Sequence, residues 1–149
     1  MGLYNGVRLR WAKLYRLEGD IVTAKSTIDA LLSDIGFPAS NKGAGLNKVL
    51  VEASEIYFAL GDYEQAEALA DALIDLLSEQ AMSDIPGNLR LGKAGLLRAA
   101  IRLEGGDASL AKQYLQAALP HLSYALDPEH ALLQEAMELE RSIEDTIAR

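Results

Sequence analysis

The side chains able to do chemistry in this sequence are mostly carboxylates, because cysteine is absent and histidine occurs only twice, as His121 and His130. The two histidines lie nine positions apart across a predicted linker, which is not the spacing of a metal-binding pair on a helix. The sequence also lacks the Ser-His-Asp, Gly-x-Ser-x-Gly, phosphate-loop and dinucleotide-binding patterns. We therefore predict no catalytic set, no metal site and no cofactor, and we expect both imidazoles at the surface.

The carboxylates form an acidic stripe in the segment predicted as a helix over 63–80. Steps of three or four positions place its members on one helix face: Glu64, Glu67, Asp71, Asp75 and Glu79. Nine acidic residues and no lysine or arginine lie between Val49 and Leu89. Metal or acid–base chemistry needs carboxylates that converge from several elements. We expect a solvated outer face, with docking of a basic partner as the alternative.

Length and composition predict one domain with a hydrophobic core over 1–149. The chain has 149 residues, of which 50% are hydrophobic and 24% charged, which is enough for a core and excludes a disordered chain. A net charge of -8 argues against nucleic acid and anionic membranes as partners. The sequence has no apolar run of the ~20 residues that span a bilayer and no signal-peptide core in Met1–Arg10. We expect a cytoplasmic protein.

A Gly-Asp pair recurs three times, beginning at Gly19, Gly61 and Gly106, and the residues around it keep one spacing. A small residue precedes each glycine by seven positions and an alanine follows it by five. These residues are Ala12 and Ala24, Ser54 and Ala66, and Ala99 and Ala111. Each Gly-Asp pair predicts a tight turn between two antiparallel helices, in which glycine takes an unusual backbone angle and aspartate caps the second helix.

The small residues are expected where the two helices of a hairpin touch, with Tyr15 and Tyr57 wedged into the hairpin core beside them. The helices are predicted over 5–18, 21–35, 46–60, 63–80, 89–104 and 108–119. They form hairpins of about 5–36, 46–80 and 88–120, with turn-rich linkers at 36–45 and 83–88. Pro120 should end or kink the sixth helix. Asp127 and Pro128 should start a terminal helix of about 128–148.

With Tyr57, Gly61, Asp62, Tyr63 and Ala66, the second hairpin resembles a tetratricopeptide repeat (TPR). The first hairpin repeats the pattern, whereas the third has arginine at the tyrosine position. Successive glycines are 42 and 45 residues apart, which is similar to the long repeats of kinesin light chains and of bacterial signalling proteins and regulators. The resemblance implies an all-α, right-handed α-solenoid of three hairpins with a C-terminal capping helix. Another solenoid of helical hairpins is the alternative, because the family proline is missing at the end of the second helix, where Gly36 and Ser78 lie.

The resemblance also implies a non-enzymatic module that binds a protein or peptide in a groove lined by the first helix of each hairpin. The groove residues expected on this basis are Leu9, Lys13, Arg16, Lys48, Val51, Glu55 and Phe58. Phe58 would be the aromatic anchor, and the cations would suit an acidic or carboxylate-bearing peptide. The alternative for these residues is packing of their alkyl stems between hairpins. Trp11 is expected in the core or between hairpins.

We expect the module to belong to a larger signalling or transcription-regulating protein. The first hairpin is predicted to begin within about five residues of Met1, so a longer chain or another subunit should cover that face. Alternative functions are an effector-sensing domain that binds a small ligand between hairpins and a self-association module, which would form a homodimer. An enzyme is the last alternative.

Overall fold

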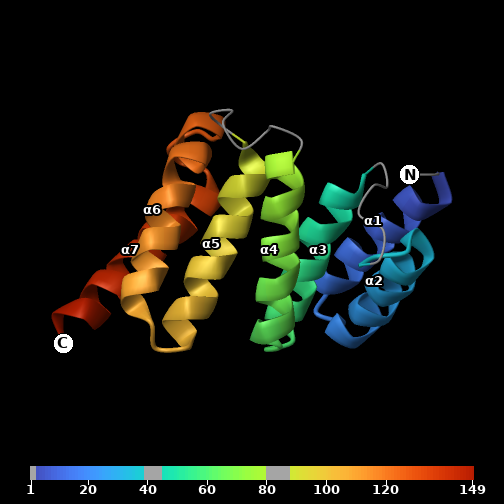
Figure 1. Ribbon diagram of the computed structural model, residues 1–149, viewed down its shortest axis with the longest axis horizontal. Helices are drawn as coiled ribbons and strands as arrows, with labels where there is room; N and C mark the ends of the chain where they lie inside the picture. Colours follow the sequence, from blue (N-terminus) through green and yellow to red (C-terminus); the bar gives the residue numbers. More distant parts are fainter. Residues whose placement is uncertain (1–2, 39–44, 80–87) are drawn as a thin grey trace. The chain divides into compact units, whose positions relative to one another are not determined.

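The computed structural model describes residues 3–38, 45–79 and 88–149, and within these ranges every regular element is an α-helix. Figure 1 labels these helices. They are α1 (Leu3–Leu17), α2 (Ile21–Ile35), α3 (Leu46–Ala59), α4 (Tyr63–Glu79), α5 (Leu89–Glu104), α6 (Ala108–Ala125) and α7 (Ala131–Ala148). The all-helical prediction is confirmed. Most of each predicted linker lies outside the described residues.

The chain divides into two compact units, residues 1–76 and 77–149. In the first unit α1 packs against α2 and α3, and α2 also packs against α3. In the second unit α5 packs against α6 and α7, and α6 packs against α7. Neighbouring helices therefore pack within each unit, and the single domain of the sequence analysis stays a prediction.

The three Gly-Asp turns share one geometry. Gly19, Gly61 and Gly106 have φ angles of 87°, 81° and 86°, in the left-handed region that favours glycine. The N–H of each following aspartate donates to the carbonyl oxygen five residues earlier, at 2.9 to 3.0 Å. The aspartate carboxylate then accepts a hydrogen bond from the backbone N–H three residues on, at 3.1 to 3.2 Å. The predicted turn and its cap therefore close all three hairpins.

The small residues on either side of these turns are all buried. None of the six predicted residues, from Ala12 to Ala111, exposes more than 3% of its surface. The third hairpin adds two glycines on α5 that the sequence analysis did not single out. A Cβ atom on Gly95 would lie 2.7 Å from the Ala118 Cβ, and one on Gly92 would lie 2.7 Å from a Leu122 methyl group. Close approach of α5 to α6 therefore depends on these glycines.

Pro120 does not end α6, contrary to the first of the two expectations for it, because the helix continues to Ala125. Proline lacks the N–H that would bond within the helix, a loss of about 3 kcal/mol in a helix interior. Leu122, two positions beyond it, is fully buried and belongs to the core of the second unit. Burial of this side chain against α5 holds the last turns of α6 in helical conformation.

The terminal helix begins later than predicted. Asp127 and Pro128 precede α7 in a turn, in which the His130 N–H donates to the Asp127 carbonyl at 2.9 Å. His130 is the N-cap instead, since its Nδ1 accepts a hydrogen bond from the Leu132 N–H at 3.0 Å. An Asp-Pro pair is common both in turns and at the start of helices, so the sequence did not distinguish the two. In the structure this pair forms a turn.

Trp11 is not in a core, which corrects the prediction for it. Half of its surface is exposed, whereas its neighbour Ala12 is completely buried. One residue corresponds to a rotation of about 100° around a helix, so burial of Ala12 directs Trp11 away from the packed side. The Trp11 ring lies 5.9 Å from that of Tyr15, which is half-buried, while Tyr57 is buried as expected.

Candidate peptide-binding site

The residues predicted for the groove come from α1 and α3, which pack against each other in the first unit. Arg16 on α1 joins the two helices. Its Nε lies 2.5 Å from Glu52 Oε1, and its Nη2 lies 3.3 Å from Glu52 Oε2 and 2.8 Å from Glu55 Oε2. The structure therefore brings together two predicted groove residues, Arg16 and Glu55, around a third residue that was not predicted.

The ion-paired centre formed by Arg16, Glu52 and Glu55 is largely shielded from water. The exposed fractions of their side chains are 20%, 7% and 29%, respectively. Burial of the Arg16 guanidinium acts to lower its pKa, but the hydrogen bond to Glu52 and the charges of Glu55 and Glu52 outweigh it and raise the pKa above its ordinary value. Arg16 is therefore held as a cation between two carboxylates.

The other groove residues divide by exposure. Lys13 and Lys48 are exposed, while Leu9, Val51 and Phe58 are half-buried. The Phe58 ring lies 5.3 Å from the ring of Tyr63, the first residue of α4. We call the surface formed by the seven predicted groove residues on these two helices the α1–α3 face. It offers lysine ammonium groups, partly covered apolar side chains, and an arginine whose charge is already compensated.

Glu52 is the functional candidate that sequence reasoning missed. It is buried on α3 with apolar neighbours three before and four after it, Val49 and Ile56, both fully buried. A carboxylate on the apolar face of a helix needs a cation, because an uncompensated buried charge is strongly unfavourable. This helical spacing was a usable signal, and only the partner, 36 positions away, required the tertiary structure.

A second polar cluster joins α2 to α3. The Tyr57 hydroxyl donates to Asp29 Oδ1 at 2.6 Å, and the Lys25 ammonium donates to Asp29 Oδ2 at 2.7 Å. Burial, followed by the hydrogen bond to Asp29 and the charge of that carboxylate, raises the pKa of Tyr57. The hydrogen bond to Asp29 is the largest cause that raises the pKa of Lys25. This cluster positions Asp29 at the edge of a pocket.

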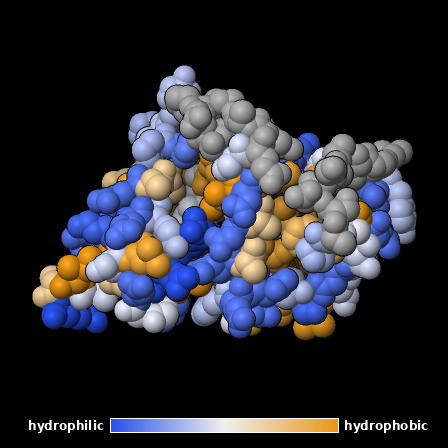
Figure 2. Space-filling model, viewed as in Figure 1, coloured by the Kyte–Doolittle hydropathy of each residue, from blue (hydrophilic) through white to orange (hydrophobic). Residues whose placement is uncertain are grey.

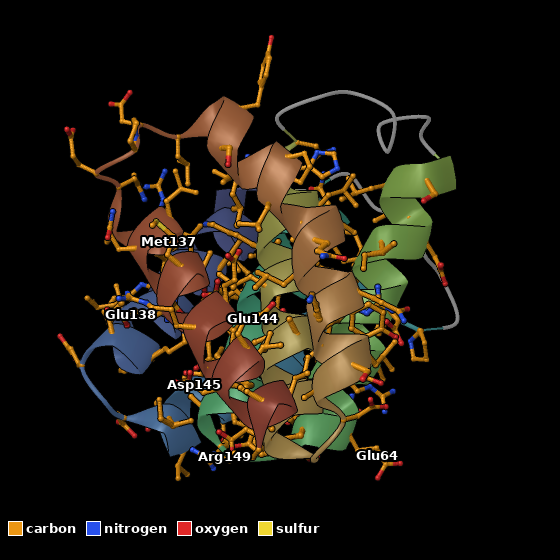
Figure 3. All side chains as sticks on the ribbon, turned by 90° about the vertical axis from the view of Figure 1, so that its left-hand side faces the viewer. Glu64, Met137, Glu138, Glu144, Asp145 and Arg149 are labelled. Atoms are coloured by element: carbon orange, nitrogen blue, oxygen red, sulfur yellow. The ribbon has the colours of Figure 1, made fainter. Side chains whose placement is uncertain are left out.

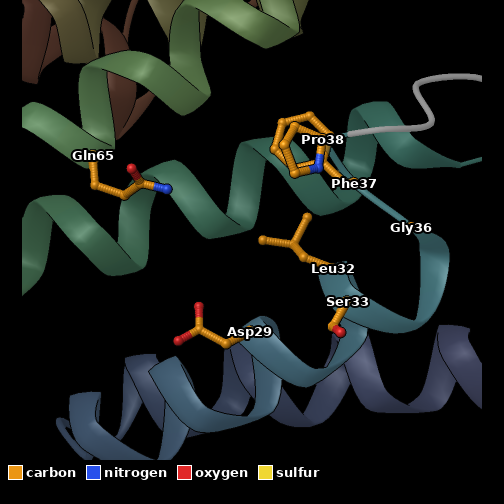
Figure 4. A pocket seen from close by; sticks show the side chains of 7 residues that line it. All are labelled: Asp29, Leu32, Ser33, Gly36, Phe37, Pro38 and Gln65. Atoms are coloured by element: carbon orange, nitrogen blue, oxygen red, sulfur yellow. The ribbon is translucent and has the colours of Figure 1, made fainter.

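The pocket has a volume of about 430 Å³ and lies in the first unit. Figure 4 shows Asp29, Leu32 and Ser33 on α2, with Gln65 on the neighbouring α4. Its remaining walls come from the segment that follows α2, namely Gly36, Phe37 and Pro38. Apolar side chains with three polar groups form a wall suited to a small amphipathic group.

The acidic stripe on α4 is only partly a solvated face. Glu64 and Asp75 are exposed, whereas Glu67 and Asp71 are half-buried. His121 is also half-buried on α6, contrary to the expectation of a surface imidazole. Among the residues that the structure describes, no three His, Asp or Glu side chains are grouped so that they could hold a metal ion.

Figure 2 shows hydrophilic residues over much of the visible surface, interrupted by apolar ones. None of the helices in the described ranges is both long and apolar enough to cross a membrane. No model of a protein family matches this chain, and a search among curated proteins finds no similar sequence.

Proposed function

We propose that the chain is a TPR-like, right-handed α-solenoid module that binds a protein or peptide segment on the α1–α3 face and catalyses no reaction. The observation that supports this most directly is the repetition of one hairpin geometry. Three Gly-Asp turns with the same φ angle, the same backbone hydrogen bond and the same aspartate cap close the hairpins. Repeated hairpins that bury small residues are typical of stacked repeats, whose extended surfaces bind other chains.

The charges of the α1–α3 face indicate the chemistry of the ligand. Because Arg16 is engaged by Glu52 and Glu55, a ligand carboxylate would have to compete with both of them. Lys13 and Lys48 are exposed and carry no such constraint from this centre. The proposed ligand is therefore an extended peptide whose acidic side chains meet the two lysines and whose apolar side chain contacts Phe58. In this proposal the module serves a larger signalling or transcription-regulating protein.

The test uses peptides selected from a random library on the purified chain, with affinity measured by fluorescence anisotropy. Lys13→Glu and Phe58→Ala should each weaken binding by about tenfold, as expected for contacts worth about 1.4 kcal/mol. The effect of Lys13→Glu should shrink as salt rises, whereas that of Phe58→Ala should persist. Circular dichroism and melting temperature establish that each variant remains folded.

The matched control is the double variant Gln113→Glu, Gln116→Glu. Both glutamines are exposed on α6 in the second unit, and the pair changes the net charge as much as Lys13→Glu does. The control should bind like the wild type. If it weakens binding as much as Lys13→Glu, the effect reflects total charge. If both test variants bind like the wild type, the peptide site is not on the α1–α3 face.

The pocket beside Asp29 favours a second candidate function, the sensing of a small ligand. Filling it with Ser33→Trp should abolish the stabilisation that a bound compound gives in a thermal-shift screen. An exposed serine outside the pocket, changed as Ser109→Trp, is the control. A compound that stabilises the Ser33→Trp variant as strongly as the wild type would place its site elsewhere.

A further inference from the structure

One side of α1 is an exposed apolar surface. Tyr4, Val7, Trp11 and Leu14 have 74%, 39%, 50% and 47% of their surface exposed. Their spacing of three, four and three positions places them in one row along the helix, as in the seam of a coiled coil. We call these four residues the α1 stripe. A contiguous apolar row of this kind marks a surface that another helix can cover.

The charges beside the α1 stripe favour an acidic occupant. The helix carries four basic residues and no acidic one. Arg8 pairs with Asp34 at 2.6 Å and Arg16 with the carboxylates of α3, while Arg10, which flanks the stripe, is exposed. Antiparallel pairing of two α1 helices through the stripe would bring Arg10 of one copy opposite Arg8 of the other, and like charges there oppose it. A helix with apolar and acidic residues is the better fit.

An exposed flank of α7, beside the buried row of Leu133, Ala136 and Ile143, has these properties. The helix carries five acidic residues and one basic one. Met137 and Ile147 are 51% and 47% exposed, and with Glu140 and Glu144 they repeat the spacing of three, four and three positions. Figure 3 shows Met137, Glu138, Glu144 and Asp145 along this helix. Glu144 also pairs with Lys112 at 3.0 Å, but both side chains are about half exposed, and such pairs contribute little to stability.

We propose that the α1 stripe of one copy docks on this flank of α7 of a second copy. Trp11 and its neighbours cover Met137 and Ile147, and Arg10 lies close to the α7 carboxylates. Each copy then contributes a different surface, so the contact is heterologous. A dimer formed in this way leaves one α1 stripe and one α7 flank unoccupied. This contact uses the side of α1 opposite Ala12 and does not depend on the peptide site proposed above.

The test is complementation between two blocked variants, followed by sedimentation velocity. Trp11→Glu blocks the α1 stripe, and Met137→Lys with Ile147→Lys blocks α7. The average mass of the wild type should rise with concentration and fall with added salt, while each blocked variant alone should stay monomeric. An equimolar mixture of the two should form a dimer and nothing larger, because only one productive contact remains.

Two controls separate association from damage to the fold. Val22 is 73% exposed on α2 and outside the stripe, so Val22→Glu should associate like the wild type. Leu14→Glu is the second stripe variant and should behave as Trp11→Glu does. Dimerisation of the α7-blocked variant by itself would mean that α1 pairs with α1. That result, or a wild type that stays monomeric at every concentration, overturns the proposal.

Discussion

Arg16→Met removes the cation that joins α1 to α3 while keeping a side chain of similar length. It leaves the Glu52 carboxylate, whose side chain is 7% exposed, without its guanidinium and close to Glu55. Loss of one partner from a fully buried pair costs about 3 to 5 kcal/mol. Because Arg16 and Glu55 are 20% and 29% exposed, water screens part of that cost, and we expect a loss of about 2 to 3 kcal/mol. For a chain of this size this lowers the melting temperature by about 5 to 10 °C.

Glu52→Gln should destabilise the protein less than Arg16→Met does. The amide keeps the shape of the side chain and an acceptor for the Arg16 Nε, and Arg16 keeps Glu55 at 2.8 Å. We therefore expect a loss of only about 1 kcal/mol. The double variant Arg16→Met, Glu52→Met should recover much of the stability lost in Arg16→Met, because no buried carboxylate is then left at position 52.

The assay is urea unfolding followed by circular dichroism at neutral pH. Arg10→Met is the control, since Arg10 is an exposed arginine on the same helix and should change the free energy of unfolding by less than about 0.5 kcal/mol. If Arg16→Met is as stable as this control, or if Glu52→Gln is the less stable of the two, the ion-paired centre does not join the helices as argued.

Three further predictions concern packing and pH. Ala66 is completely buried and Ala68 exposed, so Ala66→Leu should cost about 1 to 3 kcal/mol in urea unfolding and Ala68→Leu almost nothing; equal costs contradict the hairpin register. Gly6→Ala should stabilise by about 0.5 to 1 kcal/mol, because nothing lies within 4 Å of the added Cβ, whereas Gly95→Ala should destabilise by about 1 kcal/mol through its 2.7 Å contact. Relative to the wild type, the melting temperature of Gly6→Ala should rise and that of Gly95→Ala should fall. The raised pKa of Tyr57 gives stability that is complete below about pH 10, the unfolded value, and is lost as pH rises through the folded pKa. In alkaline unfolding Tyr57→Phe should therefore lose less stability than the wild type over that pH range.

The local features of the fold were predictable because each is encoded within a few residues. The Gly-Asp turns combine a left-handed glycine with an aspartate cap, and both effects act over three or four positions. The spacing of apolar residues predicted helices for the same reason. The close approach at Gly95 was not predicted, since a glycine inside a helical pattern shows its purpose only when the opposing side chain is known.

The orientation of α1 was the main failure of sequence reasoning. This helix has apolar residues on more than one side, so periodicity alone did not indicate which row would pack. Burial of Ala12 and the pairing of Arg16 with Glu52 decide the orientation, and they leave Trp11 exposed. Likewise, the resemblance suggested Arg16 for a ligand carboxylate, whereas the structure gives it two carboxylates from α3.

The central claim is that the chain binds a peptide on the α1–α3 face. An NMR titration of the isotopically labelled chain with a selected peptide tests it most directly. We expect the backbone amide shifts of Leu9, Lys13, Val51 and Phe58 to change with a single binding constant, and the amides of α6 not to respond. Shifts confined to α6 and α7, with α1 and α3 unaffected at saturation, would contradict it.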